Sequence, residues 1–200
     1  MPALTCYRLD GLGREVAAAS GDALLSALER GDADALRDVY RRQHEMVRAF
    51  ARRLLGSEAD AEEIVQDVFV DLPRAVRRFR GDCALSTFVM SVTVNHARHF
   101  MRAAGRRRAA HSRLALQALT EERMAPATDE ASEREELALA LLRAMERLPD
   151  EQRLAFVLCD VEERSSAEAA LILDVPASTL RSRLGAARSA LRELLEEQAR

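Results

Sequence analysis

Apolar side chains recur every three to four positions along most of this chain, which is the spacing of one face of an α-helix. Prolines and glycines fall mainly between these periodic segments. The pattern predicts helices over residues 22–30, 33–55, 59–72, 85–103, 133–147, 150–160, 166–173 and 177–197. A short alternating run at 91–94 (SVTV) lies inside a longer helical pattern, and we interpret it as helix. The expected fold class is therefore all-α.

The stretch 104–132 interrupts this pattern, because it loses the helical periodicity and changes its charge sign. We interpret it as a linker with room for a helical turn around Leu114–Leu119. The sequence therefore predicts two small helical domains joined by a flexible linker. We expect a poorly ordered tail at 1–20, a domain at 21–108, the linker at 109–132 and a domain at 133–200. Pro73 is expected to end or kink its helix.

Net charge changes the picture only when it is resolved along the chain. The 200 residues carry a formal charge of -3, which on average argues against a nucleic-acid binder. All 30 basic residues are arginine, and they are segregated. Residues 74–113 hold ten arginines against one aspartate, residues 117–151 hold four against ten carboxylates, and residues 178–192 hold four with no carboxylate. Two basic blocks thus flank an acidic one, and the global charge conceals two candidate nucleic-acid surfaces.

Several classes of protein are disfavoured. No apolar run approaches the ~20 residues that span a bilayer, and the N-terminus lacks a signal-like pattern, so we expect no membrane insertion and a cytoplasmic location. Cys6, Cys83 and Cys159 form no CxxC pair, which disfavours a disulfide framework or a zinc site. No phosphate-binding glycine loop or nucleophile motif is present. We expect no enzymatic activity, no cofactor and no metal.

Residues 166–192 fit a helix, a tight turn and a second helix. Asp174 and Val175 interrupt the first helix, and Pro176 suits the start of the next. The predicted buried stripe of the second helix consists of Leu180, Leu184, Ala187 and Leu191. The opposite face carries Ser178, Thr179 and Ser182, flanked by Arg181 and Arg183. Hydroxyls and forked guanidinium groups suit base edges and phosphates in the major groove, whereas the alternative is a solvated surface helix.

Residues 59–72 combine an apolar face with an acidic one. Asp60, Glu63, Asp67 and Asp71 lie nearly opposite the predicted buried positions. Two readings of this stripe stay open, namely a solvated face and a docking surface for a basic partner protein.

Residues 85–103 place an aromatic ring among polar groups. Phe88, Ser91, Asn95, His99 and Arg102 share one face at helical spacing, with Arg98 at its edge. This mixture suits single-stranded nucleic acid, since bases stack on the ring while guanidinium groups follow the phosphates. The alternative is that Phe88 belongs to the core.

A metal site is a weaker reading of the same region. His96 and His99 could combine with Glu62 and Glu63, but no second ligand pair has a comparable spacing. A helical metalloenzyme is therefore a rival hypothesis from another class.

Together, these halves resemble bacterial RNA polymerase sigma factors of the sigma-70 family, extracytoplasmic-function class. Residues 39–108 (from VYRRQHEMVRAFARRLLG through ADAEEIVQDVFV to STFVMSVTVNHARHFMR) are similar to region two of that family. Residues 148–193 (LPDEQRLAFVLCDVEERSSAEAALILDVPASTLRSRLGAARSALRE) are similar to region four. The resemblance implies a non-enzymatic factor that binds core RNA polymerase, directs it to specific promoters and helps to melt the DNA.

The resemblance also implies roles for individual residues. Those matching the segment that binds the clamp helices of the largest polymerase subunit are Asp60, Glu63, Gln66 and Asp67. Those matching the segments that read and melt the minus-ten element are Arg80, Asp82, Ser86, Thr87, Phe88, Asn95, Arg98 and Arg102. Those matching the helix that reads the minus-thirty-five element are Ser178, Thr179, Arg181, Ser182 and Arg183, with Arg188 on backbone phosphate. Further implied partners are the polymerase flap and an anti-sigma factor.

The chain departs from the family pattern at four positions. Phe88 stands where tryptophan is usual, and Pro73 stands where an aromatic residue is common. Asp174 replaces the usual turn glycine, and Ala186 replaces a basic residue. The nearest rival function is a stand-alone helix-turn-helix regulator, which would need neither the acidic stripe nor the Phe88 face. An adaptor that sequesters a regulator is another alternative.

Overall fold

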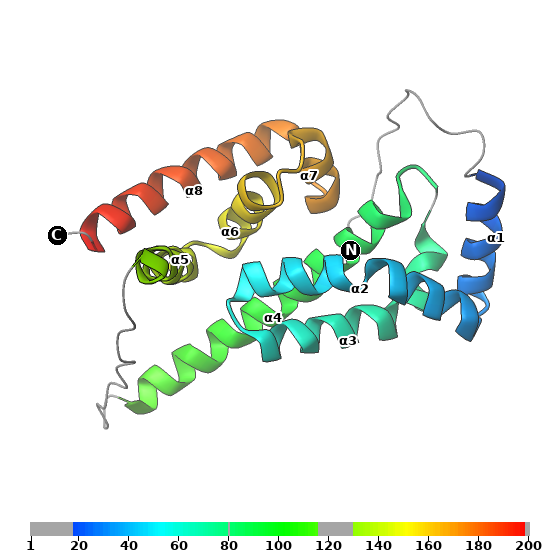
Figure 1. Cartoon of the computed structure of the whole chain (residues 1–200), viewed down its shortest axis with the longest axis horizontal. Coiled ribbons are helices and arrows are strands. Elements are labelled where there is room, and N and C mark those ends of the chain that lie inside the picture. The colour runs from blue at the N-terminus through cyan, green and yellow to red at the C-terminus, as the bar shows by residue number, and fades with distance from the viewer. Residues whose placement is uncertain (1–17, 80, 116–129, 199–200) are drawn as a thin grey trace.

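The computed structural model describes residues 18–79, 81–115 and 130–198, and every regular element within these ranges is helical. This confirms the all-α prediction, including helix at residues 91–94. The first group comprises α1 (Ala18–Glu29), α2 (Ala33–Leu55), α3 (Glu58–Ala75), the 3₁₀ turn η1 (Val76–Arg78) and α4 (Leu85–Ala115). The second comprises α5 (Glu130–Glu146), α6 (Asp150–Phe156), the π-helical turn η2 (Val157–Val161), α7 (Ser166–Leu173) and α8 (Ala177–Gln198). We call these the N-terminal and C-terminal units (Figure 1).

Local capping chemistry explains where the first helices begin and end. The Asp32 carboxylate accepts hydrogen bonds from the backbone N–H groups of Asp34 and Ala35, both at 2.9 Å, and these bonds lower the pKa of Asp32. At the end of α2, Gly56 has a φ of 74°, a left-handed conformation that glycine adopts without steric cost. Ser57 then caps α3 by accepting a hydrogen bond from the Asp60 N–H at 3.3 Å. The chain therefore reverses tightly between α2 and α3.

Several helices extend further than the periodicity predicts. Helix α1 begins at Ala18, inside the predicted tail, and α5 begins at Glu130, inside the predicted linker, so both boundaries were wrong by about three residues. The end of α4 lies at Ala115 rather than at residue 103, because Ala and Arg are strong helix formers and no proline interrupts residues 104–115. The end of α3 lies at Ala75, beyond Pro73, and the chain then tightens into η1. Residues 1–17 of the predicted tail, residues 116–129 of the predicted linker and Arg80 lie outside the described residues.

The core consists of two clusters, and one of them is shared between the units. The first cluster lies within the N-terminal unit and includes Val39, Ile64, Val68 and Leu72, each at most 1% exposed. The second joins residues of α2 and α4 to residues of α5–α8, and its members include Phe50, Leu54, Met90, Val94, Leu148, Leu154, Ile172 and Leu173. The two units therefore pack against each other through apolar side chains. No helix among the described residues is long and apolar enough to cross a membrane.

The backbone of the turn after α7 is strained, because a residue with a side chain, Asp174, occupies a left-handed position. Asp174 adopts φ 55° and ψ 51°, which is left-handed backbone, and its N–H bonds the Leu171 carbonyl at 3.2 Å. An L-residue is disfavoured in this conformation, although aspartate tolerates it better than most. This explains why glycine is the usual residue of such turns.

Asp174→Gly is accordingly expected to stabilise the protein. The gain in the free energy of unfolding should be about 0.5–1 kcal/mol, because glycine removes the strain at the cost of a more flexible unfolded chain. Urea denaturation would measure it, with Asp174→Ala as the matched control that keeps a Cβ and should destabilise. Equal stabilities for the two variants would contradict the strain at this turn.

Candidate nucleic-acid and partner-protein interfaces

The C-terminal unit contains the predicted helix-turn-helix. Ser165 begins α7 with a capping box, in which the Glu168 N–H donates to Ser165 Oγ at 3.2 Å and the Glu168 carboxylate accepts from the Ser165 N–H. The predicted buried stripe of α8 is confirmed, since Leu180, Leu184, Ala187 and Leu191 are all buried. This stripe fixes the rotation of α8 and therefore which side chains it presents outward.

The outward side of α8 carries most of the predicted reading residues. Ser178, Arg181 and Ser182 are exposed, whereas Thr179 and Arg183 are half-buried. No described carboxylate forms an ion pair with Arg181. The N-terminal half of α8 thus presents hydroxyls and a guanidinium group to solvent, which is suitable chemistry for a major groove.

Arg188, the predicted phosphate contact, has a partner within the unit. Its Nε and Nη2 donate to the two carboxylate oxygens of Asp160 at 2.8 and 2.5 Å. These hydrogen bonds raise the pKa of Arg188. Asp160 lies on η2, so this pair ties the π-helical turn to α8, and Asp160 was not identified from the sequence.

The N-terminal unit presents the acidic face of α3. Glu63, Gln66 and Asp67 are exposed and Asp60 is half-buried, while the opposite face of α3 packs into the core. Val70 lies on the same exposed side and is 79% exposed, which is unusual for a valine. Val70 was not identified from the sequence, although its place one turn beyond Gln66 and Asp67 is a usable signal. An acidic face with an exposed apolar side chain at one end suits a protein partner better than DNA.

Two of the four residues of the metal hypothesis, Glu62 and His96, are engaged in other contacts. Glu62 accepts from Arg48 Nε at 3.0 Å, and His96 lies 3.4 Å from Asp71. Arg48 also pairs with Glu58, and this contact raises the pKa of Arg48. Among the described residues, no group of three His, Cys, Asp or Glu side chains is arranged to hold a metal ion.

The predicted minus-ten residues occupy varied environments along the start of α4. Arg102 is exposed, while Asp82, Ser86, Asn95 and Arg98 are half-buried. Thr87 is 9% exposed and Phe88 only 4%. The Phe88 ring packs against Phe79 with ring centroids 4.8 Å apart. In this structure the ring belongs to the core cluster of the N-terminal unit.

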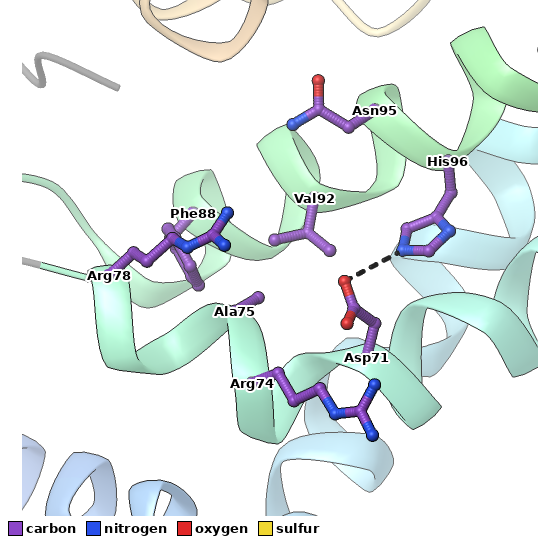
Figure 2. A pocket seen from close by; sticks show the side chains of 8 residues that line it. All are labelled: Asp71, Arg74, Ala75, Arg78, Phe88, Val92, Asn95 and His96. Carbon is purple, nitrogen blue, oxygen red and sulfur yellow. Dashed lines mark ion pairs between the residues drawn. The ribbon is translucent and has the colours of Figure 1, made fainter. Parts of the chain in front are cut away.

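A pocket of about 340 Å³ lies beside Phe88. Its lining residues come from the end of α3, from η1 and from α4, and Figure 2 shows them as Asp71, Arg74, Ala75, Arg78, Phe88, Val92, Asn95 and His96. Arg74 and Arg78 are exposed cations at this site. The pocket combines an apolar wall with hydrogen-bonding and cationic groups, which is suitable for an unstacked base and its phosphate.

Because Phe88 is buried, its truncation is expected to cost stability before it affects any ligand. Phe88→Ala should lower the free energy of unfolding by about 3–5 kcal/mol, the usual range for an aromatic residue removed from a core. Denaturant melting of the full chain measures this loss. A cost below about 1 kcal/mol, as for a surface substitution, would contradict the buried position.

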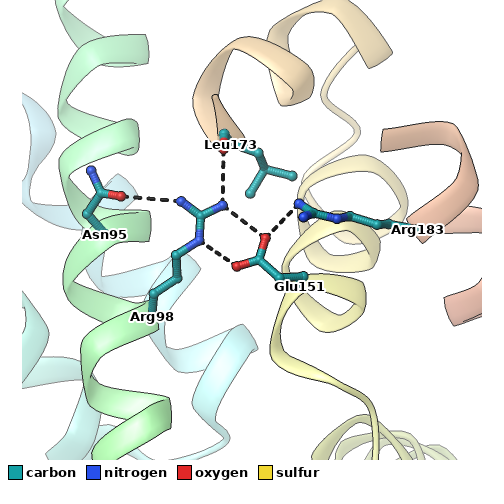
Figure 3. Close-up of polar contacts among 5 residues, drawn as sticks. All are labelled: Asn95, Arg98, Glu151, Leu173 and Arg183. Atoms are coloured by element: carbon teal, nitrogen blue, oxygen red, sulfur yellow. Dashed lines mark hydrogen bonds and ion pairs between the residues drawn. The ribbon is translucent and has the colours of Figure 1, made fainter. Parts of the chain in front are cut away.

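Residues predicted to read two different DNA elements meet at one carboxylate. Arg98 Nε and Nη2 donate to Glu151 Oε1 and Oε2 at 2.9 and 3.1 Å, and Arg183 Nη1 donates to Glu151 Oε2 at 2.7 Å (Figure 3). Arg98 also donates to the Leu173 carbonyl at 3.1 Å and to Asn95 Oδ1 at 3.3 Å. We call the three side chains Arg98, Glu151 and Arg183 the clasp. Glu151 was not identified from the sequence, since an acidic residue in the first turn of a helix is ordinary.

Comparisons with known proteins agree on one family. Residues 39–107 match the family described as sigma-70 region 2, and residues 138–191 match the family described as sigma-70, region 4. The chain is similar to the ECF RNA polymerase sigma factor SigM of Mycobacterium tuberculosis, with 34% identity over 86% of this chain and 83% of the relative. It is also similar to the ECF RNA polymerase sigma-E factor of Escherichia coli, with 32% identity over 84% of this chain and 90% of the relative.

Solved structures show the same fold. The structure of CnrH in complex with the cytosolic domain of CnrY has a TM-score of 0.60 at 21% identity, covering 88% of this chain and 96% of CnrH. The sigma factor RpoE of Bartonella quintana, in complex with the anti-sigma factor NepR, has a TM-score of 0.54 at 22% identity, covering 80% of this chain and 96% of RpoE. The arrangement of helices is thus shared with both proteins.

Proposed function

Since the chain belongs to the extracytoplasmic-function class of the sigma-70 family, and is thus a transcription initiation factor that directs RNA polymerase to promoters, we propose that three of its surfaces divide this task. The domains at 21–108 and 133–200 carry these surfaces. The factor binds polymerase and DNA, and polymerase performs the chemistry. Its place of action is the cytoplasm, where polymerase and promoters are found.

The minus-thirty-five element is read by α8. The observation that carries this role is the exposed, carboxylate-free N-terminal half of α8, with Ser178, Arg181 and Ser182 turned outward. Arg181 and Arg183 supply forked donors for guanine edges or phosphates, and Thr179 supplies a further hydroxyl. Arg188 holds a backbone phosphate.

The minus-ten element is read and held open by the start of α4 and the loop before it. Arg80, Asp82, Ser86 and Thr87 approach the DNA from the loop side, and Asn95, Arg98 and Arg102 approach it from the helix. Phe88 supports this surface from within the core and forms one wall of the adjoining pocket. An unstacked base fits a pocket of that size and composition.

Core polymerase is bound by the acidic face of α3, defined by Asp60, Glu63, Gln66 and Asp67. Three of these side chains are exposed, and Val70, at the end of the face, supplies apolar contact. The clamp helices of the largest subunit are the partner, and the C-terminal unit contacts the flap. Because RpoE of Bartonella quintana is bound by an anti-sigma factor in its structure, we infer a regulator of that kind for this chain as well.

Run-off transcription tests the assignment as a whole. Core polymerase is incubated with a pool of promoter fragments, with and without the full-length protein, and the transcripts are sequenced. New transcripts that share two upstream elements support the proposal, and their absence would overturn it. A stand-alone regulator is not favoured, since it would bind duplex DNA tightly without polymerase and would not need the face of α3.

A further inference from the structure

The guanidinium group of Arg188 is held along one edge only. Its Nε and Nη2 donate to the two carboxylate oxygens of Asp160 at 2.8 and 2.5 Å, a paired contact that fixes the plane of the group. Nη1 makes no hydrogen bond or ion pair with any residue that the structure describes. The second edge, formed by Nη1 and the other N–H of Nη2, is therefore left for another anion.

The two members of this pair differ in their exposure. The Asp160 side chain is 23% exposed, whereas the Arg188 side chain is 55% exposed. Asp160 thus supports the guanidinium group from the side of the protein, and Arg188 extends to the surface. An arginine held in this way presents its second edge to solvent in a fixed orientation.

The π-helical turn η2 supplies the carboxylate from outside α8. Within this turn the Glu162 N–H bonds the Val157 carbonyl at 2.8 Å, and the Arg164 N–H bonds the Leu158 carbonyl at 2.9 Å. A π-helical turn holds more residues than an α-helical turn, is rare, and is frequent at functional sites. Asp160 lies inside it and contacts Arg188 across the space between two elements.

Arg188 also lies at a suitable place along α8 to meet a phosphate. Arg181, the proposed base contact, precedes it by seven positions, so the two side chains lie on the same side of the helix, roughly 10 Å apart along its axis. In a helix-turn-helix the N-terminal residues of the second helix contact base edges. A cation two turns later lies nearer to the DNA backbone, where contacts set the position of the helix and carry no sequence information.

We propose that Asp160 is a positioning residue for promoter binding, which orients Arg188 so that the second edge of its guanidinium group binds a backbone phosphate beside the minus-thirty-five element. The proposal rests on the phosphate contact proposed above for Arg188. The carboxylate and the phosphate use different edges of one guanidinium group, so neither displaces the other. Asp160 itself touches no DNA.

Ordering the arginine in advance outweighs the repulsion between the two anions. A side chain that is already fixed loses less conformational entropy on binding, which is worth about 2- to 12-fold in affinity, the equivalent of ~0.5–1.5 kcal/mol. Two unit charges roughly 7 Å apart in water, on either side of a guanidinium group, repel each other, but at physiological ionic strength this costs less than about twofold in affinity. The net effect of Asp160 is therefore tighter binding.

Asp160→Asn tests this role, since it removes the charge with little change in side-chain size. Holoenzyme is formed from core polymerase and the full-length variant, and its affinity is measured on a promoter recovered in the run-off experiment. We expect a loss of about two- to tenfold relative to the wild type. Circular dichroism melting of each full-length variant checks that it folds.

Glu163→Gln is the matched control. Glu163 is an exposed carboxylate three positions after Asp160, and it forms no ion pair with a described residue. Its substitution removes the same charge from the same segment without touching Arg188, so the holoenzyme should bind as the wild type does. An equal loss in this control would attribute the effect to charge alone and would overturn the positioning role.

A double-mutant cycle with Arg188→Ala separates positioning from a general effect on the fold. Arg188→Ala alone should weaken binding, and adding Asp160→Asn should cause no further loss, because no guanidinium group is left to orient. A loss of the same size with and without Arg188 would show that Asp160 acts on the fold, and would overturn the proposal. Unchanged or tighter binding by Asp160→Asn would also overturn it, since the carboxylate would then be neutral or a competitor of the phosphate.

A second DNA probe keeps this inference distinct from the proposed function. In this probe the minus-thirty-five element is shuffled and the rest of the promoter is retained. If wild-type holoenzyme prefers the recovered promoter but Arg188→Ala binds it equally well, α8 still reads its element, and only the phosphate contact and its positioning residue fail. If the wild type binds both probes equally, the proposed role of α8 fails, and the role of Asp160 falls with it.

Discussion

Replacing both Asp60 and Asp67 with arginine is expected to abolish assembly with core polymerase while leaving the fold intact. Both carboxylates lie on the acidic face of α3, away from its buried side. Reversal places like charges against a basic partner, which costs several kcal/mol and corresponds to more than about a hundredfold in affinity. Fluorescence anisotropy of the labelled full-length protein, titrated with core polymerase, measures this loss.

The same substitutions lower the free energy of unfolding by less than they lower the affinity for polymerase, and a control variant can reproduce this loss of stability. Asp60 lies in the first turn of α3, where an acidic residue interacts favourably with the helix dipole, so its reversal costs roughly 0.3–1 kcal/mol. Asp34→Arg is the control, because Asp34 is an exposed acid in the first turn of α2 and lies outside the proposed interface. Unchanged polymerase binding by the double variant, or equal loss in the control, would rule out the acidic face as the docking surface.

Helices of this protein could be predicted from its sequence where they bury a regular apolar stripe. The stripe of α8 is one example, since its four predicted members are all buried. The end of α4 at Ala115 could not be predicted in this way. The sequence of residues 104–115 has no apolar periodicity, so only the helix propensity of its alanines and arginines could have predicted helix there.

Contacts between the N-terminal and C-terminal units could not be predicted. The sequence pattern predicts the helices of each unit, but it does not predict how the two units pack against each other. Arg98 and Glu151 are 53 positions apart, and nothing in either local pattern pairs them. Phe88 illustrates the same limit, since helical spacing placed it beside Asn95 and Arg102 but could not decide between surface and core. The ring is buried because Phe79, from the segment after η1, packs onto it.

Arg181→Ala is expected to weaken promoter binding without affecting assembly with polymerase. Arg181 is exposed on α8 and forms no ion pair with a described residue, so its truncation removes a DNA contact and little else. Loss of one base contact costs about 1–3 kcal/mol, or roughly 5- to 150-fold in affinity. Arg192→Ala is the control, because it removes an exposed charge further along α8. It should lower the affinity only slightly, equally for all DNA sequences, and it should reduce the salt dependence of binding.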